Sequence, residues 1–583
     1  MQRMRVAVVL AGAIAVCASP SRTRAGSSSA EVERLLRTMQ VQEKVGQLLM
    51  VGFGGTKVDR RIEKWVKDRQ VGGVALFSRN IVDLEQTARF ARDLQALAEG
   101  GIPIFLALDQ EGGNVVRVKD GAMMLPGNMA LGATRSPTLA YVAGQALAID
   151  LRLLGFNMNL APVLDVNSNP RNPVIGVRSY GERPELVGNL GAWYVRGQQE
   201  MGVVAVAKHF PGHGDTQSDS HFSMPAILAD YRRLEEVELQ PFRRAIDAGL
   251  DAIMTAHIAL PRIAEQPDVP ATLSHRILQG TLRDRLGFEG VVITDGLEMQ
   301  GIVKRYGSGR AAVLAVLAGA DMPMILWTQQ MKEEVYGALL EAVRAGVISE
   351  ERLDRSVRRI LTVKARRGLF NRHLEPIDSV LARRNRNPIH DQVAQRIARE
   401  AVTLVRNRGE VLPLRSARYR KVVVVAPPGA FGRDLAREPN VELITVPFVP
   451  SRERRRADVG AIVRAAHDAD VLVLAVINRY HVAISALALE QLPHVPTALI
   501  SFASPYYLQS LPDVDAYVCT YSYLDVAQTA ATNAVLGKAK MQGRLPISIP
   551  GFYAYGHRVD DRLAELAKSA HSSLHEAAFE KMP

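Results

Sequence analysis

The sequence predicts an α/β protein, with a (β/α)8 barrel of the TIM type followed by a smaller α/β domain. Short apolar runs alternate with amphipathic helical stretches, and polar residues recur where the apolar runs end. The chain has 583 residues, which is too long for one ordinary hydrophobic core. Its composition, 47% apolar and 23% charged, is typical of a globular protein.

Eight apolar runs are the predicted barrel strands. They span residues 48–53, 72–77, 103–109, 156–166, 203–210, 252–258, 290–296 and 322–327. Amphipathic helices separate most of them, for example at residues 84–99 and 235–249. This alternation is typical of a (β/α)8 barrel, and a doubly wound sheet is the structural alternative. Polar side chains stand at several strand ends, where barrel enzymes place their chemistry. They are Asp109, Asp165, Lys208, His209, His257 and Asp295.

A polar stretch after residue 370 separates the barrel from a second α/β pattern. Apolar runs at 421–427, 471–478, 497–503 and 516–522 predict a mostly parallel sheet with both faces covered. The predicted units are a barrel domain at 31–375, a linker at 376–392, a second domain at 393–553 and a peripheral tail at 554–583.

The first 18 residues are predicted to be a signal peptide. Arg3 and Arg5 precede an apolar run at 6–16, and small residues follow, so cleavage after Ala18 is expected. The alternative is a lipoprotein signal in which Cys17 is lipidated. Either interpretation predicts an exported protein that is periplasmic, extracellular or lipid-anchored in the cell envelope. Residues 19–30 are predicted to form a linker.

The chain carries a formal net charge of +12 and only two cysteines. A basic surface favours anionic partners, but no nucleic-acid module is recognisable, and the arginine run at 452–456 is best explained as a solvated face. Removal or lipidation of Cys17 would leave no intramolecular disulfide. Cys519 lies in an apolar run and is predicted to be a buried, small hydrophobic residue.

The loop at 208–221, KHFPGHGDTQSDSH, concentrates the polar residues of the barrel half. A metal site is one interpretation, but the His and Asp spacings match no usual zinc pattern. A polar loop whose histidines only form hydrogen bonds is a second. The third and favoured interpretation is a proton-transfer dyad, in which Asp219 holds one nitrogen of His221 and the other nitrogen exchanges a proton near neutral pH.

Asp295 is the second candidate, because it ends the apolar strand in the segment 293–299, ITDGLEM. A carboxylate there should project into the barrel mouth. The alternative is a structural role, since an aspartate at a strand end can cap the following helix.

Together these segments resemble glycoside hydrolase family 3, and specifically its N-acetyl-β-glucosaminidase branch. The resemblance covers most of the chain. Its barrel segments are 41–53, 72–80, 109–118, 126–134, 159–170, 175–184, 208–221 and 293–299. Residues from about 390 to 550 are similar to the α/β sandwich domain that often follows the barrel in this family.

The resemblance implies roles for individual residues. Asp295 matches the nucleophile, His221 matches the acid/base histidine peculiar to this branch, and Asp219 matches its partner. The positions that hydrogen-bond the sugar hydroxyls are matched by Asp109, Arg117, Arg178, Lys208 and His209. No metal ion and no organic cofactor is implied. Two positions depart from the family pattern: Gly296 replaces a common aspartate, and Asn114 replaces a common arginine.

The resemblance therefore implies a retaining, exo-acting β-N-acetylglucosaminidase. Its expected partner is a small carbohydrate, either a peptidoglycan-derived muropeptide that contains N-acetylglucosamine or a chito-oligosaccharide. Nucleic acid is not expected, a membrane only through lipidated Cys17, and a monomer is the default. The alternatives are a β-glucosidase or β-xylosidase of the same fold, a non-catalytic glycan-binding envelope protein, and transfer of the glycosyl group to phosphate instead of water.

Overall fold

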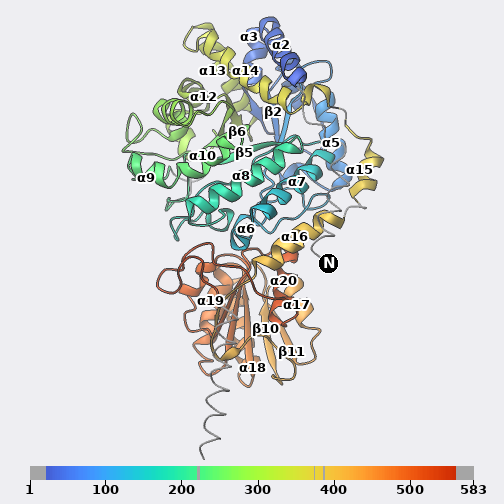
Figure 1. Ribbon diagram of the computed structural model, residues 1–583, viewed down its shortest axis with the longest axis vertical. Helices are drawn as coiled ribbons and strands as arrows, with labels where there is room; N and C mark the ends of the chain where they lie inside the picture. Colours follow the sequence, from blue (N-terminus) through green and yellow to red (C-terminus); the bar gives the residue numbers. More distant parts are fainter. Residues whose placement is uncertain (1–21, 219–223, 373, 385–387, 560–583) are drawn as a thin grey trace, which may run out of the picture.

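Eight parallel strands close into a barrel, as the sequence predicts. The computed structural model describes residues 22–218, 224–372, 374–384 and 388–559, and Figure 1 shows the barrel above a smaller α/β domain. The strands are β1 (Met50–Val51), β2 (Gly73–Leu76), β3 (Phe105–Leu108), β4 (Met158–Asn159), β5 (Val204–Phe210), β6 (Ala252–Thr255), β7 (Val291–Gly296) and β8 (Met322–Ile325). The barrel closes between β1 and β8, where Met50 is paired with Met324.

The barrel interior is filled by side chains that alternate along the strands. Met50, Phe105 and Met158 belong to this inner cluster, and all three are fully buried. Ile360 and Leu369, from the last helical segments of the barrel half, belong to the same cluster. The interior is therefore a packed core, and polar chemistry is confined to the ends of the strands.

Helices surround the barrel on its outside (Figure 1). The α-helices of this half are α2 (Arg22–Thr38), α3 (Val41–Gln47), α4 (Arg60–Glu63), α5 (Leu84–Ala96), α6 (Asn128–Thr134), α7 (Pro137–Leu153), α8 (Pro184–Glu200), α9 (Tyr231–Glu236), α10 (Leu239–Asp247), α11 (Gln300–Tyr306), α12 (Ser308–Ala318), α13 (Gln329–Arg344) and α14 (Glu350–Arg366). Short π or 3-10 segments join them: η2 (Lys64–Asp68), η3 (Ser78–Asn80), η4 (Gly176–Arg178), η5 (Ala271–Leu273), η6 (Arg276–Arg285) and η7 (Leu369–Asn371).

The second domain contains a six-stranded sheet in the order β11-β10-β12-β13-β14-β9. Its strands are β9 (Thr403–Asn407), β10 (Val422–Ala426), β11 (Val441–Thr445), β12 (Val471–Val476), β13 (Thr497–Ser501) and β14 (Ala516–Cys519). All neighbours are parallel except β9, which runs antiparallel to β14. The sequence predicts the four central strands and misses both edges, because β11 is half exposed and β9 ends in polar residues.

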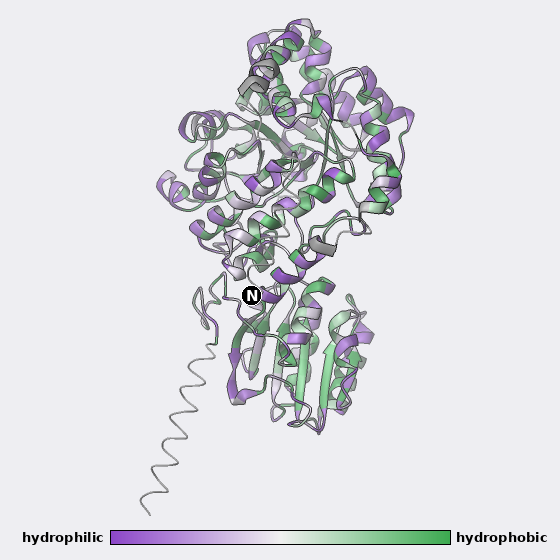
Figure 2. Ribbon diagram, turned by 45° about the vertical axis from the view of Figure 1, so that its right-hand side comes forward, coloured by the Kyte–Doolittle hydropathy of each residue, from purple (hydrophilic) through white to green (hydrophobic). Residues whose placement is uncertain are grey.

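Helices and two short 3-10 segments complete the second domain. They are α17 (Ala430–Leu435), α18 (Arg452–Ala466), α19 (Arg479–Leu489), α20 (Asp525–Val535), η8 (Arg408–Glu410) and η9 (Pro505–Gln509). Figure 2 shows apolar residues along the strands of this sheet and polar residues on the helices that cover it. Cys519 on β14 is buried in this core, as the sequence predicts.

The segment predicted as an interdomain linker is largely helical. It contains α15 (Ile377–Arg384) and the start of α16 (Pro388–Ala401), which packs against α6 and α7 of the barrel and against α20 of the second domain. Likewise, α2 begins inside the segment predicted as the first linker. The predicted signal peptide and most of the predicted tail lie outside the described residues. Within the described ranges, no helix has the length and apolarity needed to cross a membrane.

Candidate active site

The carboxyl ends of β3 and β5 carry a buried ion cluster. Lys208, the fifth residue of β5, places its Nζ atom 2.7 Å from Oδ1 of Asp109 and 2.7 Å from Oε1 of Glu111. Asp109 and Glu111 follow β3, which lies two strands away in the barrel. Burial alone would lower the pKa of Lys208, but the two carboxylates outweigh it and raise that pKa. The ammonium group is therefore charged and fixed in position.

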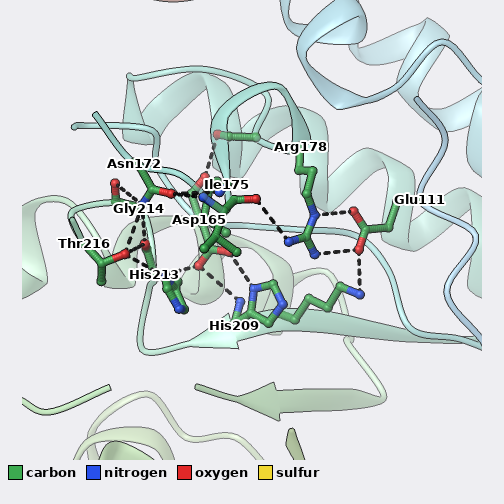
Figure 3. A network of polar contacts seen from close by, with 12 residues as sticks. Glu111, Asp165, Asn172, Ile175, Arg178, His209, His213, Gly214 and Thr216 are labelled. Atoms are coloured by element: carbon green, nitrogen blue, oxygen red, sulfur yellow. Dashed lines mark hydrogen bonds and ion pairs between the residues drawn. The ribbon is translucent and has the colours of Figure 1, made fainter. Parts of the chain in front are cut away.

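Two arginines extend this cluster across the barrel mouth. Arg178, on η4 in the loop after β4, forms a bidentate pair with Glu111, with N–O distances of 2.8 and 2.9 Å (Figure 3). Arg117 donates to Oδ2 of Asp109 at 3.1 Å. The pKa of Glu111 lies well below its ordinary value, because Arg178 and Lys208 outweigh its burial. Four predicted sugar-binding residues thus belong to one network.

Asp165 holds the two histidines at the end of β5 (Figure 3). Its Oδ2 lies 2.7 Å from Nδ1 of His209, and its Oδ1 accepts the backbone amides of His209 and His213 at 3.2 and 2.6 Å. The Asp165 side chain is completely buried, yet its pKa is lowered by these partners. Burial lowers the pKa of His213, even though the carboxylates of Asp165 and Asp295 oppose this effect.

Asp295 is half buried near the end of β7. The backbone amide of Gly296 donates to its Oδ1 at 2.7 Å. The following helix, α11, begins at Gln300 with Met299 as its N-cap, so Asp295 is not the cap of that helix. The carboxylate is therefore available for chemistry at the face where the ion cluster lies.

The predicted dyad partners, Asp219 and His221, lie in the segment 219–223, outside the described residues. The part of this loop that precedes them is well anchored. The side-chain amide of Asn172 donates to the backbone oxygens of His213 and Gly214 at 2.8 and 3.0 Å. A Cβ atom at Gly214 would lie 1.7 Å from the backbone oxygen of Val166, so only glycine permits this close approach.

Three carboxylates of this site were not among the predicted site residues. Glu111 bridges Lys208 and Arg178, and Asp165 orients the histidines. Glu298 accepts the backbone amides of residues 326–328, at 2.6 to 3.0 Å, and so ties the loop after β8 to the segment after Asp295. Their positions near strand ends were the available signal. The groups that each carboxylate binds were not readable from its spacing in the sequence.

The two positions that depart from the family pattern differ in their surroundings. Asn114 is exposed. Gly296 is buried, and its backbone oxygen lies 3.0 Å from Nε2 of His257. In the part of the chain that the structure describes, no group of three or more His, Cys, Asp or Glu side chains is arranged to hold a metal ion.

Comparisons with known proteins agree with this architecture. Residues 40–363 match the model of the glycosyl hydrolase family 3 N-terminal domain. Beta-hexosaminidase A of Pseudoalteromonas piscicida is 30% identical over 559 residues, covering 85% of this chain and 92% of the relative. A beta-N-acetylglucosaminidase/beta-glucosidase of Cellulomonas fimi is 31% identical over 550 residues, covering 88% and 95%.

A solved structure shares both domains. The family 3 beta-N-acetylglucosaminidase of Paenibacillus sp. strain FPU-7 superposes with a TM-score of 0.82 at 37% identity, covering 88% of this chain and 99% of that one. The alignment therefore includes the barrel and the second domain.

Proposed function

This chain belongs to glycosyl hydrolase family 3 and is a glycoside hydrolase, and from that premise we propose that it is a retaining, exo-acting β-N-acetylglucosaminidase. The similar solved structure is named a beta-N-acetylglucosaminidase, one relative a beta-N-acetylglucosaminidase/beta-glucosidase and the other a beta-hexosaminidase, and these names support the proposed sugar. The observation on which the proposal depends is the ion-pair network of Asp109, Glu111, Lys208 and Arg178, which lies at the face where β7 carries Asp295 near its end. Such a network can bind the hydroxyl groups of one terminal sugar.

In the proposed reaction, Asp295 attacks C1 of the sugar, and the bond from C1 to the leaving oxygen breaks. His221 gives its proton to that oxygen, so the first product leaves as an alcohol. A water molecule then attacks C1 and loses its proton to His221, which frees Asp295. Two displacements retain the configuration at C1. Asp219 would orient the ring and stabilise its protonated form.

The charged side chains around the nucleophile are proposed to bind the sugar. Lys208, Arg178 and Arg117 would donate charge-assisted hydrogen bonds to sugar hydroxyls, and Asp109 would accept one. His209, held by Asp165, would present its remaining ring nitrogen to the substrate. Because these groups are already held by ion pairs and hydrogen bonds, little reorganisation is needed when a sugar binds.

The proposed natural substrates are peptidoglycan fragments or chito-oligosaccharides with terminal, β-linked N-acetylglucosamine. This choice rests on the predicted signal peptide at residues 1–18, which would export the protein, free or anchored through Cys17. We propose that it acts as a monomer and without a cofactor.

The deciding experiment compares release of p-nitrophenol from the β-N-acetylglucosaminide, the β-glucoside and the β-xyloside. Faster release from the β-N-acetylglucosaminide supports the proposal. Faster release from the β-glucoside or the β-xyloside would show that the protein is a β-glucosidase or a β-xylosidase instead. Parallel reactions with and without phosphate identify the acceptor, because phosphorolysis yields the sugar 1-phosphate. Absence of turnover on all three, with retained glycan binding, would indicate a non-catalytic binding protein.

A further inference from the structure

The loop between β4 and α8 presents two residues of the candidate site. Asp165 stands near its start and Arg178 near its end, and its regular structure is limited to the single turn η4. An irregular segment has no continuous backbone ladder, so its shape depends on specific contacts.

The two limbs of this loop are joined at their base. Ser179 Oγ donates to the backbone oxygen of Asp165 at 2.6 Å. The backbone amide of Asn167 donates to the oxygen of Gly181 at 2.9 Å. These bonds set the distance between the limbs. They do not attach the loop to the rest of the molecule.

The second domain contacts the first limb through Tyr506. The side-chain amide of Asn167 donates to the phenol oxygen of Tyr506 at 2.9 Å. Asn167 is 1% exposed, and Tyr506 lies on η9 of the second domain. Asn167 is two residues from Asp165, so this bond lies next to the carboxylate that holds His209.

The second limb is held more firmly, by the segment around Ser548. The backbone amide and the hydroxyl of Ser548 each donate to the Glu182 carboxylate at 2.7 Å. The amide of Glu182 donates to the backbone oxygen of Pro546 at 3.0 Å. Gly181 has a φ of +156°, and a Cβ atom there would lie 2.4 Å from the same Pro546 oxygen. The limb that ends in Arg178 therefore rests directly on the second domain.

We propose that the second domain positions the candidate active site, with Tyr506 and Ser548 as positioning residues that hold the loop presenting Asp165 and Arg178. Neither residue needs to touch the substrate. The effect on activity that we expect from this inference rests on the proposed function. A displacement of about 1 Å in a positioning group can cost roughly 10²-fold in rate, so a loop held at both limbs affects catalysis without taking part in it.

The chain offers a matched pair of variants for the test. Tyr506→Phe removes the phenol bond to the loop. Tyr507→Phe removes an equivalent bond, from the phenol to the backbone oxygen of Ile477 at 3.1 Å, which stays within the second domain. We expect Tyr506→Phe to lower kcat/KM for the aryl N-acetylglucosaminide about fivefold, mainly through KM. Tyr507→Phe should leave both constants unchanged.

Ser548 provides the second half of the test. Ser548→Ala removes a hydroxyl that donates to a carboxylate, so we expect roughly a tenfold fall in kcat/KM. Ser548→Thr keeps the hydroxyl and should restore most of the activity. If Tyr506→Phe combined with Ser548→Ala only lowers stability and leaves kcat and KM at wild-type values, the contact is purely structural and the inference is wrong.

Hydrogen exchange separates this inference from the proposed function. Amides in the peptides covering residues 163–182 should exchange faster in Tyr506→Phe and Ser548→Ala than in wild type, and at the wild-type rate in Tyr507→Phe. This readout needs no turnover. If the wild-type protein hydrolyses no glycoside but the variants still show this exchange pattern, the proposed function is wrong and the positioning role remains supported. Unchanged exchange in all three variants would overturn the positioning role.

Discussion

Glu111 and Lys208 form an ion pair in which Nζ lies 2.7 Å from Oε1 and the side chains are only 2% and 3% exposed. Arg178 shares the same carboxylate. The cluster contains two cations around Glu111, and removal of the anion would leave Arg178 without its carboxylate partner and Lys208 with Asp109 alone. Such a cluster stabilises the fold only while it is complete. Its value to the protein is the fixed geometry of the site.

Glu111→Gln should therefore lower the free energy of unfolding by about 3–5 kcal/mol, because a neutral amide cannot balance the charge of Arg178 and leaves Lys208 with one carboxylate instead of two. Urea denaturation at pH 7 measures this change. Glu63→Gln is the control, since Glu63 forms an exposed pair with Lys67 and should cost about 1 kcal/mol or less. An equal fall in the free energy of unfolding for the two variants would show that the buried ion pair stabilises the fold no more than an exposed one.

The pKa values of the buried carboxylates predict how the free energy of unfolding depends on pH. The pKa values of Asp109, Glu111 and Asp165 are lower in the folded chain than their ordinary values of 3.8, 4.5 and 3.8. The unfolded chain therefore takes up protons first as the pH falls. The stabilisation is complete above these ordinary values and is lost below them.

Urea denaturation at a series of pH values between 7 and 3 measures this dependence. Glu111→Gln should show a shallower loss of stability below pH 4.5 than wild type, because one of the responsible carboxylates is missing. Parallel curves for the two proteins would contradict this assignment.

Asp295→Ala should reduce kcat for the aryl N-acetylglucosaminide by roughly 10³-fold or more, because the proposed nucleophile is lost. The fold should stay intact, because the Asp295 side chain is only half buried. A fluorinated N-acetylglucosamine analogue that traps the glycosyl-enzyme provides an independent measurement. Mass spectrometry should place the sugar on the peptide containing Asp295. A label on another carboxylate would reassign the nucleophile.

Asp165→Asn should lower kcat/KM by roughly 10²-fold, because an amide cannot hold His209 as the carboxylate does and the ring loses its fixed orientation. Asp150→Asn is the matched control. Asp150 holds His390 at the same distance of 2.7 Å, also in a buried pair, but this pair joins α7 to α16. The control should lose stability and keep its kinetic constants. A similar fall in kcat/KM for both variants would mean that the effect is general destabilisation.

The strands of the barrel, and the order of the two domains, were predictable because each buried strand is a short apolar run whose period is readable locally. Predictions failed where local sequence is ambiguous. The edge strands β9 and β11 were missed, because β9 ends in polar residues and β11 is half exposed. The segment predicted only as a linker contains helical residues.

The sequence by itself determined which residue types end the strands, and so placed Asp109, Lys208, His209 and Asp295 at one face of the barrel. Only the tertiary structure decided that Glu111 joins Lys208 to Arg178, that Asp165 holds both histidines, and that Tyr506 and Ser548 reach across to the loop after β4. The reason is physical: strand periodicity is a local property, whereas a buried charge takes its partner from whichever chain segment the closed barrel and the docked domain bring within hydrogen-bond distance.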